Sequence, residues 1–197
     1  MDKLAFLSEI LLVAVLWTFA FKGPLNFWIG ILMAALVMIA FSLRRGVLGV
    51  IRPTPSDVPL GVLYGLLLFA ATWLSAVVVR EYLPSLYLHV EAVKSLRSLA
   101  PPMMYVPVVL TVSTAEEFFW RGTVQRILSL KLGKLPGFLL ALALYVGVHV
   151  LAGNPALALA SAVAGAFWGF LYILHRDLTP VWISHLVWDV LLLVVGI

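Results

Sequence analysis

Long apolar runs are the feature that most restricts how this chain can fold. Runs of about 17 to 25 apolar residues fit helices that cross a lipid bilayer. Seven such runs occur, at 4–21, 25–43, 59–79, 102–121, 135–151, 156–174 and 179–196. Most are bounded by Pro or Gly, and they lack the alternating pattern of barrel strands. The sequence therefore predicts an all-α, polytopic transmembrane helical bundle of about seven spans.

The composition agrees with a chain that folds in lipid. Hydrophobic residues make up 63% of the 197 residues and charged residues 11%, against roughly 45–50% and about 25% in an average soluble domain. The net charge of +4 is compatible with nucleic-acid binding, but the Lys and Arg residues lie in short clusters between apolar runs. That distribution favours a membrane and no nucleic-acid partner. Because the sequence has no cysteine, thiol chemistry is excluded.

Basic residues are unevenly divided between the two ends of the predicted spans. If the N-terminus is cytoplasmic, nine of them face the cytoplasm, namely Lys3, Arg44, Arg45, Arg52, Arg121, Arg126, Lys131, Lys134 and Arg176. The other four are Lys22, Arg80, Lys94 and Arg97. Since cytoplasmic loops retain Lys and Arg, we expect the N-terminus in the cytoplasm.

Three further patterns predict local structure. Residues 86–100 place apolar and charged side chains on opposite helical faces, which predicts a short interfacial helix with a structural role. Ser161, Gly165 and Gly169 recur every four residues, so they share one face and predict close helix packing. Glu9 lies within two turns of the predicted interface, where its side chain can reach water.

Ionisable residues inside apolar helices are concentrated in the C-terminal half. They are Glu116, Glu117, Arg121, His149, His185 and Asp189. A charged residue at the bilayer centre costs roughly 2.5–3.5 kcal/mol on insertion scales, and such residues commonly mark functional sites. A single buried His or Glu is as compatible with packing as with function, but several together favour function.

Spacing relates these residues to one another. Glu117 and Arg121 are four apart, as in a stabilising helical ion pair, and Glu116 is turned about 100° from Glu117. Four residues also separate Tyr145 from His149 and His185 from Asp189. The last pair is similar to the carboxylate that fixes the tautomer of a catalytic imidazole. We interpret Tyr145 as an aromatic packing residue.

Three ordered motifs resemble those of the CAAX protease and bacteriocin-processing family, also called CPBP or Abi. They are Glu116-Glu117-Phe118-Phe119-Trp120-Arg121, Tyr145-Val146-Gly147-Val148-His149 and His185-Leu186-Val187-Trp188-Asp189. The family patterns read EExxxR, an aromatic with His four residues later, and His with Asn or Asp four residues later. In prenyl-protein endopeptidases the last position is Asn, an amide donor, whereas ionised Asp189 only accepts hydrogen bonds.

The resemblance implies a helical membrane fold with a water-filled cavity and a glutamate-dependent intramembrane endopeptidase in a prokaryotic plasma membrane. We expect one integral membrane domain over 1–197, with no motif in 1–100 and a catalytic core at 102–193. The implied substrate is a membrane-associated protein or peptide, such as a prenylated C-terminus, a secreted peptide precursor or a sorting signal. No cofactor is expected.

The working hypothesis gives each polar residue a role. Glu116 is the general base on water, assisted by His149, while His185 donates to the oxyanion and Asp189 orients His185. Glu117 and Arg121 support the site as an ion pair. Counting depth along straight helices nevertheless places His149 roughly 10 Å from the level of Glu116 and His185.

Other functions remain open at this stage. Two His and a carboxylate can form a zinc site with an open position, although the HExxH motif is missing. A proton-coupled transporter also uses intramembrane Glu and His, but it often has broken helices in both halves of the chain. A non-enzymatic membrane scaffold is the third alternative. The oligomeric state does not follow from the sequence.

Overall fold

Proline and asparagine set several helix starts in the computed structural model, which describes residues 3–196. Proline occupies the first turn of four helices, where its missing N–H costs no hydrogen bond. The side chains of Asn26 and Asn154 accept hydrogen bonds from backbone N–H groups at two helix starts. No strand occurs within residues 3–196, and the predicted all-α class is confirmed.

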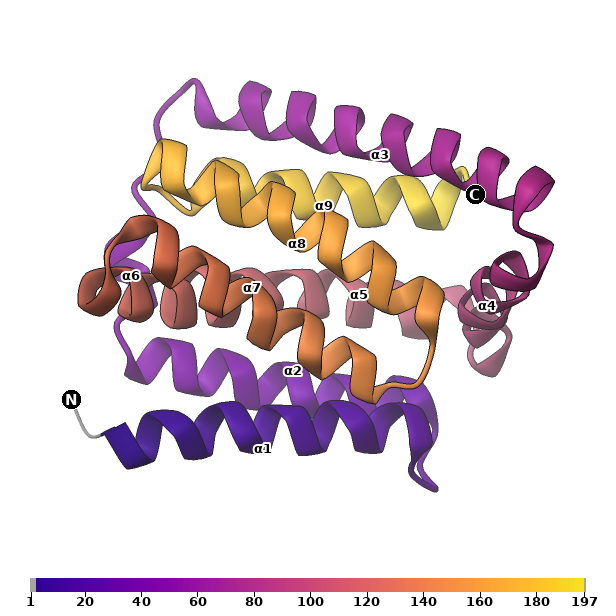
Figure 1. Cartoon of the computed structure of the whole chain (residues 1–197), viewed down its shortest axis with the longest axis horizontal. Coiled ribbons are helices and arrows are strands. Elements are labelled where there is room, and N and C mark those ends of the chain that lie inside the picture. Colours follow the sequence, from indigo (N-terminus) through magenta and orange to yellow (C-terminus); the bar gives the residue numbers. More distant parts are fainter. Residues whose placement is uncertain (1–2, 197) are drawn as a thin grey trace.

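The described chain consists of helical segments joined by short turns. In order they are α1 (Lys3–Lys22), α2 (Phe27–Arg44), η1 (Val47–Val50), α3 (Asp57–Tyr82), α4 (Pro84–Ser95), η2 (Leu96–Leu99), α5 (Pro102–Glu116), η3 (Glu117–Gln125), α6 (Arg126–Leu132), α7 (Lys134–Leu151), α8 (Pro155–His175) and α9 (Thr179–Val194). Most of the long helices run along one direction of the bundle, α7 and α8 cross it obliquely, and α4 lies at the end opposite the N-terminus (Figure 1).

Five helices are long and apolar enough to cross a membrane: α1, α2, α3, α7 and α8. They correspond to five of the seven predicted spans, and the protein is an integral membrane protein. The seventh predicted span is α9, an apolar helix of 16 residues that ends at Val194 instead of residue 196. The predicted interfacial segment 86–100 is α4 followed by the 3-10 helix η2.

The fourth predicted span is not a plain α-helix. The run predicted at 102–121 changes from α5 to the π-helix η3 at Glu117 and continues through α6 to Leu132. The hydroxyl of Thr123 donates to the carbonyl oxygen of Phe118, five residues earlier, at 3.0 Å. π-Helical turns often occur at functional sites, and this one begins inside the EExxxR motif.

The buried apolar side chains form two clusters, and η3 contributes residues to both. One cluster joins α1 and α2 to α5, η3 and α7, and the other joins α3, α8 and α9. α3 and α9 lie side by side at one edge of the bundle, while α1 and α2 lie at the opposite edge (Figure 1). Gly61 and Gly65 permit close α3–α9 packing, because an added Cβ would lie within 3 Å of α9 atoms.

Two sequence interpretations need correction at charged positions. Glu9 is buried, and its carboxylate pairs with Arg44 and, at 3.0 Å, with Arg45, so it joins α1 to α2 instead of reaching water. Arg121 is also buried inside the bundle. Arg121 is therefore not counted among the cytoplasmic basic residues. The predicted division of basic residues between the two sides of the membrane changes from nine and four to eight and four.

Candidate active site

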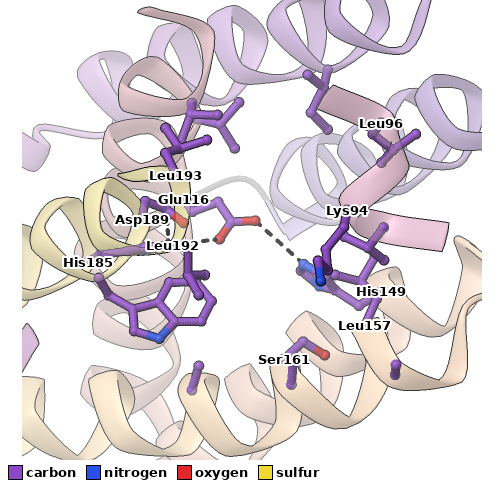
Figure 2. A pocket seen from close by; sticks show the side chains of 18 of the residues that line it. Lys94, Leu96, Glu116, His149, Leu157, Ser161, His185, Asp189, Leu192 and Leu193 are labelled. Carbon is purple, nitrogen blue, oxygen red and sulfur yellow. Dashed lines mark ion pairs between the residues drawn. The ribbon is translucent and has the colours of Figure 1, made fainter. Parts of the chain in front are cut away.

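Glu116 is the last residue of α5, and its buried carboxylate lies between two histidines from other helices. Its Oε1 atom is 3.5 Å from Nε2 of His149 on α7, and its Oε2 atom is 3.9 Å from Nε2 of His185 on α9. The hydroxyl of Tyr145 donates to Oε2 at 3.0 Å. Figure 2 shows Glu116 between His149 and His185. The acid and the two imidazoles thus meet, as the sequence hypothesis requires.

Glu117 contacts the His185 imidazole on the edge opposite to Glu116. Its Oε1 atom lies 2.8 Å from Nδ1 of His185 and accepts a hydrogen bond from Arg121 at 3.0 Å. Arg121 also donates to the carbonyl oxygen of Gly165 and lies over the rings of Tyr145 and Trp168. The predicted ion pair is present, but Glu117 has a second role because it binds His185.

The ring nitrogens of both histidines have fixed partners. Nδ1 of His149 lies 2.9 Å from the carbonyl oxygen of Tyr145, so Nδ1 carries the proton and a neutral ring presents its Nε2 lone pair toward Glu116. Nδ1 of His185 donates to the Glu117 carboxylate. The ring of His185 also stacks on Trp168, with centroids 3.7 Å apart. Both Nε2 atoms are therefore directed at the Glu116 carboxylate.

Asp189 lies beside His185, on the Nε2 side of its ring. The Oδ2 atom of Asp189 is 3.5 Å from Nε2 of His185 and hydrogen-bonds to the hydroxyl of Ser113 on α5. Glu117 binds the Nδ1 atom on the other edge of the ring. The reason is that His185 and Asp189 share one helix face, so Nδ1, on the far edge of the ring, points toward η3.

The depth mismatch expected for His149 is absent. α7 begins at Lys134, next to the predicted start, so a misplaced boundary is not the reason. The helix runs obliquely across the bundle in Figure 1. In addition, the His149 ring folds back over the preceding turn, where Nδ1 meets the carbonyl of Tyr145. Both features move the imidazole toward Glu116.

The site opens into a cavity of about 310 Å³ that extends to the α4 end of the bundle. Glu116, His149, His185 and Asp189 line it. Aromatic and aliphatic side chains form most of the remaining wall, including Trp17, Phe21, Phe27, Trp28 and Ile31 from α1 and α2 and Val90, Val93 and Leu96 from α4 and η2. Residues 1–100 contain no motif, yet they supply one side of this cavity.

Sequence reasoning missed three contributors to the site. The Tyr145 hydroxyl donates to Glu116, so the packing interpretation of Tyr145 was wrong. Its position four residues before His149 was the available signal. Trp168 stacks on His185, and Ser113 binds Asp189. For these two no sequence signal existed, because both contacts join helices that are distant along the chain.

A metal site requires several His, Asp or Glu side chains that converge on one point. Within residues 3–196, no group of three or more His, Asp or Glu side chains is arranged to hold a metal ion. The two histidines approach different oxygens of Glu116. The described residues thus do not show the three-ligand zinc group considered from the sequence.

Comparison with protein families places this site in a known context. Residues 98–191 match the family described as type II CAAX prenyl endopeptidase Rce1-like. This segment, just under half of the chain, is similar to the Rce1-like family. Comparisons with curated proteins and with solved structures gave no match. The match confirms the resemblance to the CAAX protease and bacteriocin-processing family, and it indicates a CAAX-type membrane protease, that is, a hydrolase.

Proposed function

We propose that this protein is a glutamate-dependent intramembrane endopeptidase that cleaves a membrane-associated protein or peptide. The observation that carries the proposal is the placement of Glu116 between Nε2 of His149 and Nε2 of His185 in one buried cavity. The candidate substrates are a prenylated C-terminus, a secreted peptide precursor or a sorting signal. All three present a peptide segment at the membrane.

Water activation is assigned to Glu116 and His149. Tyr145 occupies Oε2 of Glu116, so Oε1 is the free oxygen on the side of His149. The carboxylate and the Nε2 lone pair of His149 are both acceptors, and a water molecule between them can donate to each. As the water oxygen attacks the scissile carbonyl carbon, one proton passes to Glu116.

We assign His185 to stabilising the oxyanion that forms when water attacks the scissile carbonyl group. Its Nδ1–H group donates to Glu117, so Nε2 donates only when the ring carries both protons. The carboxylates of Glu116, Glu117 and Asp189 all lie within 4.0 Å of this ring and supply the opposing charge. An imidazolium N–H directed at the developing oxyanion lowers the barrier, and losing one such donor typically costs ~10²–10³ in kcat.

Collapse of the tetrahedral intermediate completes the reaction. The proton held by Glu116 passes to the nitrogen of the leaving group, the C–N bond breaks, and the products are a carboxylic acid and an amine. Glu116 returns to its carboxylate form, so the cycle consumes one water molecule and requires no other reagent. Asp189, next to His185 and bonded to Ser113, is assigned to positioning.

The orientation of the protein in the membrane is inferred from the distribution of its basic residues. Eight basic residues lie toward the end of the bundle where α1 begins, and four lie toward the α4 end. We therefore propose a cytoplasmic N-terminus, in the plasma membrane of a prokaryote as the family resemblance implies. In this orientation the cavity extends toward the non-cytoplasmic face.

The experiment uses purified protein in liposomes with peptides of the three candidate classes, each carrying a membrane anchor. Products are identified by mass spectrometry. Wild type and Glu81→Gln, which alters an exposed carboxylate outside the cavity, are expected to cleave at least one class, and Glu116→Gln is not. A scaffold or a transporter would cleave none of them, and that result would contradict the proposal.

A further inference from the structure

Three arginines gather at the end of the bundle where α1 begins. Arg44 and Arg45 lie at the C-terminal end of α2, and Arg126 lies where η3 passes into α6. Nη2 of Arg126 donates to the main-chain carbonyl oxygen of Arg45 at 2.6 Å, so a side chain joins the two helices here. Figure 1 shows α6 at this end of the bundle. We call Arg44, Arg45 and Arg126 the arginine cluster.

The arginine cluster carries more positive charge than its protein partners neutralise. Glu9 forms ion pairs with Arg44 and, at 3.0 Å, with Arg45. Among residues 3–196 no carboxylate forms an ion pair with Arg126, and its hydrogen-bond acceptor is a neutral carbonyl. The Nε–H group of Arg126 is buried without an acceptor. Three guanidinium groups therefore face one carboxylate, which leaves two positive charges uncompensated.

The arginine cluster lies at the level where an apolar span ends. α2 is long and apolar enough to cross a membrane, and Arg44 is its last residue. The phosphate groups of lipids lie at this boundary, just outside the hydrocarbon layer. The Arg44 side chain is 62% exposed and Arg126 is half-buried, so both remain accessible. A guanidinium has five N–H donors and binds phosphate through paired hydrogen bonds.

Exposed leucines accompany the arginine cluster on the same part of the chain. Leu43 precedes Arg44 on α2, and Leu48 lies on η1, which follows α2. Leu130 is four residues after Arg126, so the two share a face of the helix, and Leu130 is 80% exposed. Acyl chains can cover such side chains, whereas inorganic phosphate cannot. This combination of cations and apolar side chains fits an amphiphilic anion better than a free one.

We propose that the arginine cluster binds the phosphate group of an anionic phospholipid. The phosphate accepts hydrogen bonds from Arg44 and Arg126 and supplies the negative charge that Glu9 leaves unmatched, while the acyl chains lie along the exposed leucines. Because α1, α2 and α6 meet here, bound lipid links them and stabilises the folded chain. The site is separate from the wall of the catalytic cavity, and the inference does not depend on the endopeptidase function.

The test measures how purified wild type in detergent responds to two added lipids. Phosphatidylglycerol has one negative charge, and phosphatidylcholine has no net charge. Native mass spectrometry of wild type is expected to show ~5–30-fold tighter binding of phosphatidylglycerol, the range for one or two basic residues at a membrane surface. The midpoint of thermal unfolding should rise with the concentration of phosphatidylglycerol and change little with phosphatidylcholine.

Two variants show whether the preference belongs to the arginine cluster. Arg126→Gln keeps an N–H donor and removes the charge, and it is expected to lose most of the preference for phosphatidylglycerol. Lys131→Gln removes the same charge from an exposed position on another face of α6 and is expected to retain the preference. Because wild type alone supplies the comparison of lipids, the test does not depend on how well Arg126→Gln folds.

The remaining results would overturn the proposal. Equal binding of the two lipids by wild type does so, and so does an undiminished preference in Arg126→Gln. An equal loss in Arg126→Gln and Lys131→Gln assigns the preference to overall charge instead of a site. A last arm combines phosphatidylcholine with inorganic phosphate, at an ionic strength matched with sodium chloride. If the midpoint then rises as much as with phosphatidylglycerol, the site takes free phosphate and the lipid assignment is wrong.

Discussion

The Nδ1 atom of His185 lies 2.8 Å from the Oε1 atom of Glu117, and this contact joins the first and third sequence motifs across two helices. Glu117 also accepts a hydrogen bond from Arg121. The carboxylate therefore fixes both the ring orientation of His185 and the proton on Nδ1, which directs Nε2 at the cavity. Glu117 is a positioning residue in the proposed mechanism.

Replacing Glu117 with Gln is expected to impair both activity and stability. The amide can still bond His185, but it no longer neutralises the buried guanidinium of Arg121 or the imidazolium form of His185. Breaking a buried ion pair typically costs about 3–5 kcal/mol, so we expect a clearly lower midpoint of thermal unfolding in detergent. Lower kcat with little change in KM is the expected kinetic result. Glu81→Gln is the control, and equal thermal midpoints and rates for the two variants would contradict this role.

Removing the Tyr145 hydroxyl is expected to slow cleavage while the fold is retained. The ring packs beneath Arg121 and against Trp120, and Phe preserves these contacts. Without the hydrogen bond to Oε2, the Glu116 carboxylate loses a group that fixes its orientation. We expect kcat to fall ~10–100-fold in Tyr145→Phe, from the strength of hydrogen bonds to charged groups, with an unchanged unfolding midpoint. A rate equal to that of wild type would show that the hydroxyl is dispensable.

Each of the two buried histidines is expected to be needed for turnover. General acid–base groups contribute about 10²–10⁴-fold to the rate, so His149→Ala should lose activity in that range. His185→Ala should lose a comparable amount, because it removes the hydrogen-bond donor to the oxyanion. His89→Ala is the matched control because His89 is exposed on α4 and does not line the cavity. Steady-state cleavage of an anchored peptide measures these effects. Retained cleavage in His149→Ala would remove His149 from the mechanism.

The packing of α3 on α9 yields a prediction about the fold alone. A Cβ at Gly65 would lie 2.7 Å from Cβ of Val187, whereas a Cβ at Gly147 on α7 meets no atom within 4 Å. Gly65→Ala should therefore lower the unfolding midpoint in detergent, because the two backbones must separate. At Gly147 the same substitution should be neutral or slightly stabilising, since Ala favours a helix over Gly by about 1 kcal/mol. Equal midpoints for both variants would contradict this account of the interface.

Much of the fold was predictable because lipid leaves few solutions for an apolar chain. Hydrophobic runs located five of the long helices, and proline marked four helix starts. The π-helix at Glu117 was not predictable, since it depends on the tertiary packing of a segment whose composition also suits an α-helix. The assumption of a regular 100° turn separated Glu116 from Glu117, but it could not show that the two carboxylates contact opposite edges of the His185 ring.

The members of the site were predictable and their partners were not. Charged residues in apolar helices are costly, so Glu116, His149 and His185 could be identified from the sequence. Contacts between distant helices, such as Trp168 with His185, have no local signature. Glu9 shows the same limit, because only the folded chain brings Arg44 and Arg45 to it.

The central claim is that Glu116 activates water directly, and it is tested by cleavage after metal removal. Wild type and Glu116→Gln are dialysed exhaustively against a chelator, their metal content is measured, and single-turnover cleavage of an anchored peptide is followed. Unchanged cleavage by metal-free wild type and a loss of ~10²–10⁴-fold in Glu116→Gln are the predicted results. Cleavage that disappears with the metal and returns with added zinc, or that persists in Glu116→Gln, would contradict the account.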